Sequence, residues 1–298
     1  TCSPESMQDF SAVAYFFARR VQEELNIPIG LIDNAWGASS AEVWTPESVF
    51  KAHPELVESH KKIVPNKWVT VEKSSLYNGM IAPLTKFKIS GALWYQGESN
   101  TANAENYQKL FSNMITSWRT VWQDDFPFYY VQIAPFKYGD EFSGGIVRDQ
   151  QRRTLSLTNT GMAMTSDICT VEDIHPLNKQ DVGLRLANIA LKDHYNLLQG
   201  QEVYGPLYAS SEITGNQIVI NFNHADGLFS KGKKLNLFEI SNEKGQWFAA
   251  KAKIKNGAVI VSSKEVKNPK AVRYAWRSTD IGTLFNAVGL PASTFISE

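Results

Sequence analysis

The first 200 residues alternate amphipathic stretches with short apolar runs, and this alternation limits the possible folds more than any other feature. Apolar side chains at three- and four-residue steps are typical of helices with one buried face. They predict helices over 10–25, 103–122, 145–157 and 178–196, and Thr45 and Pro46 predict a helix start. The apolar runs predict buried strands at 27–36, 89–96, 126–135 and 161–168. Strands that alternate with helices predict a parallel α/β sheet covered by helices on both faces.

Beyond about residue 200, the pattern changes to short β-rich runs separated by Gly and Asn. The stretches "TGNQ" at 214–217 and "KNGA" at 255–258 are typical of hairpin turns. We therefore expect two domains: an α/β domain over 1–200 and an antiparallel β module over 201–298.

The charge balance excludes two classes of partner. Thirty basic and 30 acidic residues cancel, so the chain has no electrostatic footprint for nucleic acid or an anionic membrane. No apolar run approaches the roughly 20 residues of a membrane span. Cys2 and Cys169 are too few for a disulfide framework, and we expect two free thiols, with one bridge as the alternative. A small neutral or weakly charged molecule is the expected partner.

Three polar loops follow predicted strands at the end where open α/β sheets bind ligands. They are "NAWGASSAEVW" at 34–44, "WYQGESN" at 94–100 and "VEDIHP" at 171–176. Because the carboxyl ends of parallel strands meet at one edge, we expect these loops to converge on a single site.

His175 is the candidate general base of this site. It lies three residues after Glu172 and two after Asp173, a spacing at which an acid can orient an imidazole. A histidine held in this way usually activates a nucleophile. The alternative is a surface or capping histidine.

Two other loops offer hydrogen-bond donors. Gly37 could expose its backbone N–H to a developing oxyanion, or simply make a tight turn. Asn100 could offer a side-chain N–H to the same oxyanion, or cap a helix. Gln96 and Glu98, just past the second apolar run, are candidates for substrate contact.

Several blocks of the chain resemble the bacterial sialate O-acetylesterase family of SGNH hydrolases. They are "WGASSAEVWTP", "LYNGMIAPL", "GALWYQGESN", "DIHPLNKQDVGLRLA" and "AVRYAW". The resemblance implies a parallel-sheet SGNH-hydrolase domain of the flavodoxin-like three-layer type, and a serine esterase that deacetylates sugar hydroxyls without metal or cofactor. It also implies an oxyanion hole from the nucleophile's own N–H, Gly37 or its neighbour, and Asn100, with His175 as the base.

The chain departs from the family pattern at two places around these residues. Ala38 stands where the family usually has a second glycine, which favours Gly37 as the donor. In the wider superfamily the orienting acid lies three residues before the histidine, at Glu172, whereas the family's "DIHP" block offers Asp173. We expect Asp173 beside the base, with Glu172 or a backbone carbonyl as alternatives.

A third departure concerns the nucleophile. The family carries it in a "GQSNM"-like block on the first strand, and no such block occurs in residues 1–298. Ser39, Ser40 and Ser99 lack the strand-to-helix turn of a nucleophile and are better explained as loop or capping residues. We therefore expect the nucleophilic serine to lie outside this chain, through truncation or on a separate N-terminal segment.

Aromatic residues flank the three loops and could stack on a sugar ring, although packing is their commoner role: Trp36, Trp44, Trp94 and Tyr95. Arg148 could pair with the carboxylate of a sialic acid as a bidentate clamp, or lie on a solvated helix face. We take Trp94 and Arg148 as candidate substrate residues.

These observations predict a carbohydrate O-acetylesterase that acts on sialic acids through a serine/histidine acyl-enzyme mechanism. The alternatives are a non-catalytic carbohydrate-binding protein and an acetyl xylan esterase. We expect an O-acetylated sugar as substrate and no nucleic-acid or membrane partner. The family resemblance implies a secreted or periplasmic protein.

Overall fold

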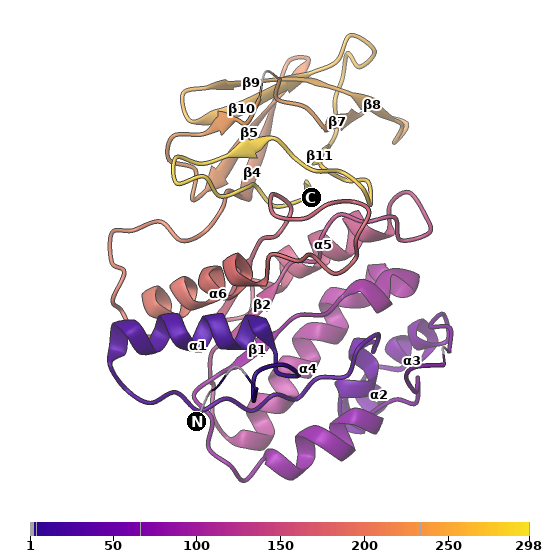
Figure 1. Cartoon of the computed structure of the whole chain (residues 1–298). Helices are drawn as coiled ribbons and strands as arrows, with labels where there is room; N and C mark the ends of the chain where they lie inside the picture. The colour runs from indigo at the N-terminus through magenta and orange to yellow at the C-terminus, as the bar shows by residue number, and fades with distance from the viewer. Residues whose placement is uncertain (1–2, 4, 66, 233, 298) are drawn as a thin grey trace.

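In the computed structural model, which describes residues 3, 5–65, 67–232 and 234–297, the first part of the chain is built on a three-stranded parallel sheet (Figure 1). The strands are β1 (Ala92–Trp94), β2 (Phe128–Val131) and β3 (Thr160–Ala163), in that spatial order. Leu93 lies opposite Tyr129, which in turn lies opposite Gly161. The predicted α/β class is confirmed.

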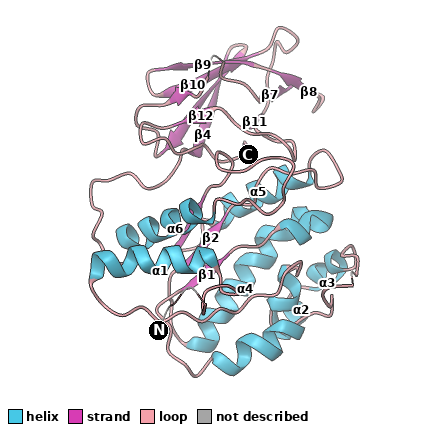
Figure 2. Cartoon of the chain, in the orientation of Figure 1, coloured by secondary structure: helices cyan, strands magenta, loops and turns pink. Residues whose placement is uncertain are grey.

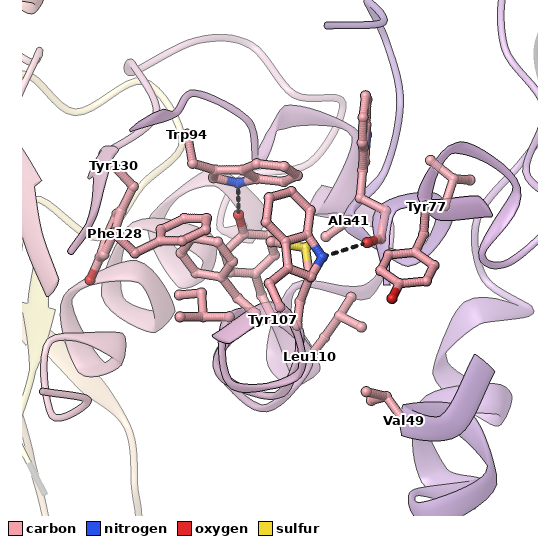
Figure 3. Close-up of a cluster of buried hydrophobic side chains, with 14 of the residues drawn as sticks. Ala41, Val49, Tyr77, Trp94, Tyr107, Leu110, Phe128 and Tyr130 are labelled. Atoms are coloured by element: carbon pink, nitrogen blue, oxygen red, sulfur yellow. Dashed lines mark hydrogen bonds between the residues drawn. The ribbon is translucent and has the colours of Figure 1, made fainter. Parts of the chain in front are cut away.

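The central strand β2 sends alternate side chains into two separate cores. Phe128 and Tyr130 are fully buried in a large aromatic core on one face of the sheet (Figure 3). Tyr129 and Val131 are buried in a second core on the opposite face. Since successive side chains of a strand point to opposite faces, four consecutive residues hold both layers of the fold.

Helices cover both faces of this sheet (Figure 2). The face of the second core is covered by α1 (Ala12–Leu25) and α6 (Lys179–Asp193), which pack against each other. The aromatic core is covered from the other side by α2 (Glu47–Ala52), α3 (Pro54–His60), α4 (Tyr107–Trp122) and α5 (Ser143–Thr154). Many of the buried side chains on this side are aromatic, and their large apolar area stabilises the packing.

The strand predicted over 27–36 does not form. This segment forms no β-ladder, and its side chains Ile27 and Ile32 are 47% and 50% exposed. A strand exists only through hydrogen bonds to a neighbour, and within the described residues β1 pairs with β2 alone, so its other edge is open. The sheet therefore has three strands in place of the four predicted.

Short helices replace parts of the predicted loops and helix starts. A 3₁₀ helix spans Ala41–Trp44, and another spans Glu98–Asn106 before α4 begins. A π-helical turn (Tyr77–Ile81) and a 3₁₀ turn (Ala82–Leu84) follow one another farther along the chain. Thr45 does not cap α2 as predicted, because its hydroxyl donates back to the Ala41 carbonyl at 2.8 Å and Pro46 takes the N-cap position.

The C-terminal part is antiparallel β structure around a third core. One sheet has the order β4 (Leu207–Thr214), β5 (Gln217–Asn223), β10 (Ala258–Ser262), β9 (Lys251–Lys255). A second has the order β13 (Phe295–Ile296), β11 (Val272–Tyr274), β7 (Phe238–Ser241), β8 (Trp247–Ala249), and β12 (Leu284–Phe285) pairs with β6 (Phe229–Ser230). Asn256 and Gly257, with φ of 52° and 76°, form the turn predicted between β9 and β10.

The β module lies directly against α5 of the α/β part. Gly145 on this helix approaches the Trp276 carbonyl so closely that a Cβ atom there would lie 1.7 Å from its oxygen. Gln132, just after β2, donates to the Ser293 hydroxyl at 2.8 Å. A division of the chain at residue 200 stays a prediction, since it separates two parts that share this interface.

In the described part of the chain, the helices are all too short or too polar to cross a lipid bilayer.

Candidate active site

Two of the three predicted loops are joined by hydrogen bonds beyond the carboxyl end of β1. The Ser99 hydroxyl donates to the Ala38 carbonyl at 2.9 Å, and the Gln96 side-chain amide donates to the Ser39 carbonyl at 3.2 Å. The backbone N–H of Ala41 donates to the side-chain oxygen of Asn100 at 2.9 Å. The loop at 34–44 and the loop at 94–100 therefore form one unit, as expected for segments at the same edge of a sheet.

Asn100 is the centre of this unit and is completely buried. Its oxygen accepts from Ala41 and from Gln96 Nε2 at 2.7 Å, which fixes the orientation of the amide. Its Nδ2 donates to Glu42 Oε2 at 2.9 Å and to Asn103 Oδ1 at 3.0 Å. Both amide hydrogens are thus used inside the protein. The role of Asn100 toward an oxyanion stays a prediction, and it requires one of these bonds to be released.

Glu42 is a site residue that the sequence reasoning missed. Its side chain is 1% exposed, and its carboxylate accepts from Asn100 and from Asn103 Nδ2, the latter at 2.6 Å. A buried carboxylate must receive hydrogen bonds to offset the loss of water. The available signal was an acid within the apolar run "AEVW", since a charge among buried neighbours needs partners.

Gly37 and Ala38 form the turn that precedes this network. Gly37 is exposed, and no heavy atom lies within 4 Å of the position that a Cβ would take. Ala38 has a φ of 60°, in the left-handed region that costs a non-glycine residue about 1–2 kcal/mol. This conformation explains why a glycine suits position 38, and it leaves the N–H of Gly37 in an open loop.

Gln96 and Trp94 are not placed to contact substrate. Besides its bonds to the loops, Gln96 accepts from the Tyr107 hydroxyl at 3.0 Å, so both ends of its amide are used. Trp94 is 8% exposed and stacks on Phe111 within the aromatic core (Figure 3). The structure corrects both predicted substrate contacts: these side chains support the site from within.

Glu98 lies half-buried at the wall of a cavity, and this burial raises the pKa of its carboxyl above its ordinary value. Lys179, the first residue of α6, is close enough to interact electrostatically with both Glu98 and Asp173. Burial lowers the pKa of this lysine, and its ammonium lies 5.6 Å from the ring centre of Tyr95. The tyrosine hydroxyl is buried with no hydrogen-bond partner among the described residues. Lys179, in the first turn of α6, therefore lies against Tyr95 of the loop 94–100.

The His175 loop is ordered by its backbone. Asp173 Oδ1 accepts from the backbone N–H of His175 at 2.8 Å, a local turn that fixes the approach to α6. The His175 side chain is exposed, and no side chain in the described ranges forms a hydrogen bond with its imidazole. Glu172 forms an exposed ion pair with Lys137 at 2.7 Å. Of the two acids, Asp173 is the one held beside the histidine.

The serines of the loops are occupied in ways that suit structural roles. Ser39 is buried, donates to the Trp36 carbonyl at 2.7 Å and accepts from Trp44 Nε1 at 2.8 Å. Ser40 is buried as well, and Ser99 is bonded to the other loop. In the part of the chain that the structure describes, no serine hydroxyl is hydrogen-bonded to His175.

The position of Arg148 contradicts its predicted role as a clamp for a substrate carboxylate. Its side chain is 1% exposed and lies between α5 and the β module. The guanidinium donates to the hydroxyl of Thr294 and to three backbone carbonyls, at residues 275, 277 and 278, over 2.7–3.2 Å. A group enclosed in this way cannot clamp the carboxylate of a substrate.

A small cavity opens beside the joined loops. It has a volume of about 220 Å³, and one wall is formed by the site residues Ala38, Ser40, Glu98 and Ser99. Ile63, Val64 and the residues 69–71 line it as well. Pockets for drug-sized ligands measure about 300–1,000 Å³, so this space fits a single small group or sugar ring.

A larger cavity, of about 520 Å³, lies at the opposite end of the sheet. It is lined by segments that enter the strands, among them 88–90 and 124–127, and by His194. Ligands of open α/β sheets bind at the carboxyl ends of the strands, so this cavity is separate from the candidate site.

Comparison with known proteins gives a consistent family. A family model described as "Carbohydrate esterase, sialic acid-specific acetylesterase" matches residues 4–192. Sialate O-acetylesterase of Mus musculus is 26% identical over 97% of this chain and 63% of its own length, and that of Homo sapiens is 28% identical over 89% and 55%. The crystal structure of a carbohydrate acetylesterase from Xanthomonas citri matches with a TM-score of 0.89 and 33% identity, over 99% of this chain and 67% of the other. The chain thus spans 55–63% of the length of these two curated relatives.

Proposed function

The chain belongs to the sialic acid-specific acetylesterase family of carbohydrate esterases, and from this premise we propose that it removes O-acetyl groups from sugars, sialic acids foremost. The observation that carries the proposal is the joining of the loops 34–44 and 94–100 by hydrogen bonds beside a small cavity. These are the loops at which a parallel α/β sheet assembles a ligand site.

The proposed reaction is acyl transfer to a serine. The serine hydroxyl attacks the acetyl carbon while His175 takes its proton, and that proton passes to the sugar oxygen as the ester bond breaks. Water then attacks the acetyl-enzyme while His175 takes a proton from it, and that proton passes to the serine oxygen as its bond to the acetyl carbon breaks and acetate leaves. The N–H of Gly37, and Asn100 once its amide is released, would donate to the tetrahedral oxyanion. Asp173 would hold the loop of the base in place.

We further propose that the nucleophilic serine comes from outside residues 1–298, on a strand that pairs with the open edge of β1. A parallel strand in this position would end at the same edge of the sheet as β1, beside the joined loops. This proposal is supported by the absence of any described serine bonded to His175.

Acetate release from an O-acetylated sialic acid, by the full-length product of the gene, tests the function. His175→Ala should lower kcat by several orders of magnitude, to the roughly 10³–10⁴-fold enhancement over water that binding and the oxyanion hole supply. The matched control is His194→Ala, which removes an exposed imidazole at the other end of the sheet. A loss below about tenfold for His175→Ala would exclude it as the base.

Two narrower features belong to the same proposal. The preferred sugar can be a sialic acid or an acetylated xylan, and acetate release from each substrate separates the two. A protein that binds these sugars and releases no acetate would be a carbohydrate-binding protein instead. Secretion or a periplasmic location is proposed from the family resemblance alone.

A further inference from the structure

Two tryptophans that lie within two residues of cavity-lining residues in the sequence have largely exposed side chains. The side chain of Trp68 is 69% exposed and that of Trp36 is 51% exposed. Trp36 Nε1 donates to the Trp68 carbonyl at 3.2 Å, so the two residues are tied together although they come from different segments. Large aromatic rings held at the surface in this way cost free energy and commonly mark a binding surface.

The two tryptophans belong to the segments that enclose the 220 Å³ cavity. Trp36 directly precedes Gly37 in the loop of the candidate site, and its carbonyl is held by the Ser39 hydroxyl at 2.7 Å. Trp68 directly precedes Val69, which lines the cavity together with Thr70 and Val71. A ring bound against the tryptophans would therefore extend toward the site loops.

The lining combines apolar faces with hydroxyl groups. Ile63 and Val71 supply apolar surface, while Thr70 and Thr101 add polar side chains. The ammonium of Lys67 lies 4.4 Å from the ring centre of Trp68 and brings one positive charge beside this ring. A pyranose has the complementary chemistry, because it offers an apolar C–H face to an aromatic ring and hydroxyls to the surrounding polar groups.

We propose that Trp36 and Trp68 form a sugar-binding subsite that stacks the pyranose ring of the substrate and directs its ester toward Gly37 and Glu98. The proposal rests on the proposed esterase function for the direction of the ring, whereas ring binding itself does not depend on turnover. Lys67 would face a carboxylate where the sugar is acidic.

The test measures binding without catalysis. Saturation-transfer NMR and titration would use the methyl glycosides of glucose and of N-acetylneuraminic acid, without acetyl groups. Trp68→Ala and Trp36→Ala should each raise the dissociation constant at least about tenfold, the effect of losing one well-packed aromatic contact. The matched control is Phe87→Ala, which removes a 63% exposed aromatic side chain away from the cavity and should leave binding unchanged.

The outcomes separate this proposal from the esterase function. Loss of binding with unchanged thermal unfolding supports the subsite, and Trp68→Phe should then restore part of the affinity. Equal binding by wild type and both alanine variants would overturn it, as would a change from dimer to monomer in sedimentation when Trp68 is replaced. If the sugars bind through these tryptophans but the full-length protein releases no acetate, the subsite stands and the esterase proposal fails.

Discussion

Replacement of Arg148 by alanine should destabilise the whole protein rather than weaken substrate binding. The guanidinium is completely enclosed, and burial lowers its pKa because the charged form loses its hydration. Keeping this charge inside the protein therefore costs free energy. Its hydrogen bonds to Thr294 and to three carbonyls of the β module offset this cost. Alanine would remove these four hydrogen bonds and open a cavity at the interface, although each carbonyl keeps one other donor, from Phe136, Asp280 or Thr294.

The magnitude follows from these contacts. A hydrogen bond to a charged group contributes about 1.5–3 kcal/mol, and the cavity left by a large buried side chain adds to the loss. Relief of the desolvation of the charge offsets part of the loss, so we expect Arg148→Ala to lower the free energy of unfolding by about 3–5 kcal/mol. That is a large share of the roughly 5–15 kcal/mol available to a folded protein.

The assay is urea unfolding followed by tryptophan fluorescence, together with limited proteolysis of the β module. Arg148→Met, which keeps the volume and drops the charge, should lose less stability than Arg148→Ala. The control is Arg19→Ala, which breaks an exposed pair with Glu23 within α1 and should cost under about 1 kcal/mol. If Arg148→Ala unfolds like wild type and raises KM for an acidic sugar alone, the guanidinium contacts substrate and the structural argument is wrong.

Three other predictions concern the residues of the joined loops. Burial raises the pKa of the Glu98 carboxyl above its ordinary 4.5, so protonation of this group stabilises the folded state at low pH and the stabilisation is lost as pH rises. Glu98→Gln should therefore be more stable than wild type at pH 8. In thermal unfolding scans the difference in stability should vanish near pH 4. Asn100→Ala should lower the free energy of unfolding by about 2–4 kcal/mol, since it leaves Glu42 with one donor fewer, and a stable variant in urea titrations would show that this network is unimportant. Gly97→Ala should lower the free energy of unfolding by about 2–5 kcal/mol, because φ is 151° and a Cβ would lie 2.7 Å from Ile133 Cγ2. The control Gly215→Ala also places alanine at a positive φ but meets no neighbouring atom, so it should lower stability less. Equal losses of stability for the two variants would refute the clash.

Much of the fold follows from patterns within single segments. The periodic helices form within a few residues of their expected bounds, and the Asn256–Gly257 turn forms because these two residues accept positive φ. The strand expected at 27–36 fails for a reason that no local pattern contains. An apolar run becomes a strand only if a neighbour supplies hydrogen bonds, and the described chain places none beside it.

The candidate site was predictable at the level of loops and less so at the level of side chains. The loops at 94–100 and 171–176 follow the carboxyl ends of β1 and β3 as predicted, whereas the loop 34–44 follows a segment that forms no strand. Glu42 and Arg148 are buried by contacts with residues far away in sequence. An arginine on a polar helix face looks solvated until the β module covers it. Trp68 was missed because it lies in a segment without periodicity, where only the folded chain shows which rings stay exposed.

The division of β2 between two cores determines where the chain can change length. A one-residue insertion before Phe128 would exchange the partners of every side chain in the strand, and would turn Tyr129 and Val131 toward the aromatic core. Both layers would then receive side chains of the wrong size at once. An insertion at Gly30, in an extended segment without ladder bonds, changes neither layer. Length variation among homologous chains should therefore avoid 128–131 and gather in loops such as 27–36.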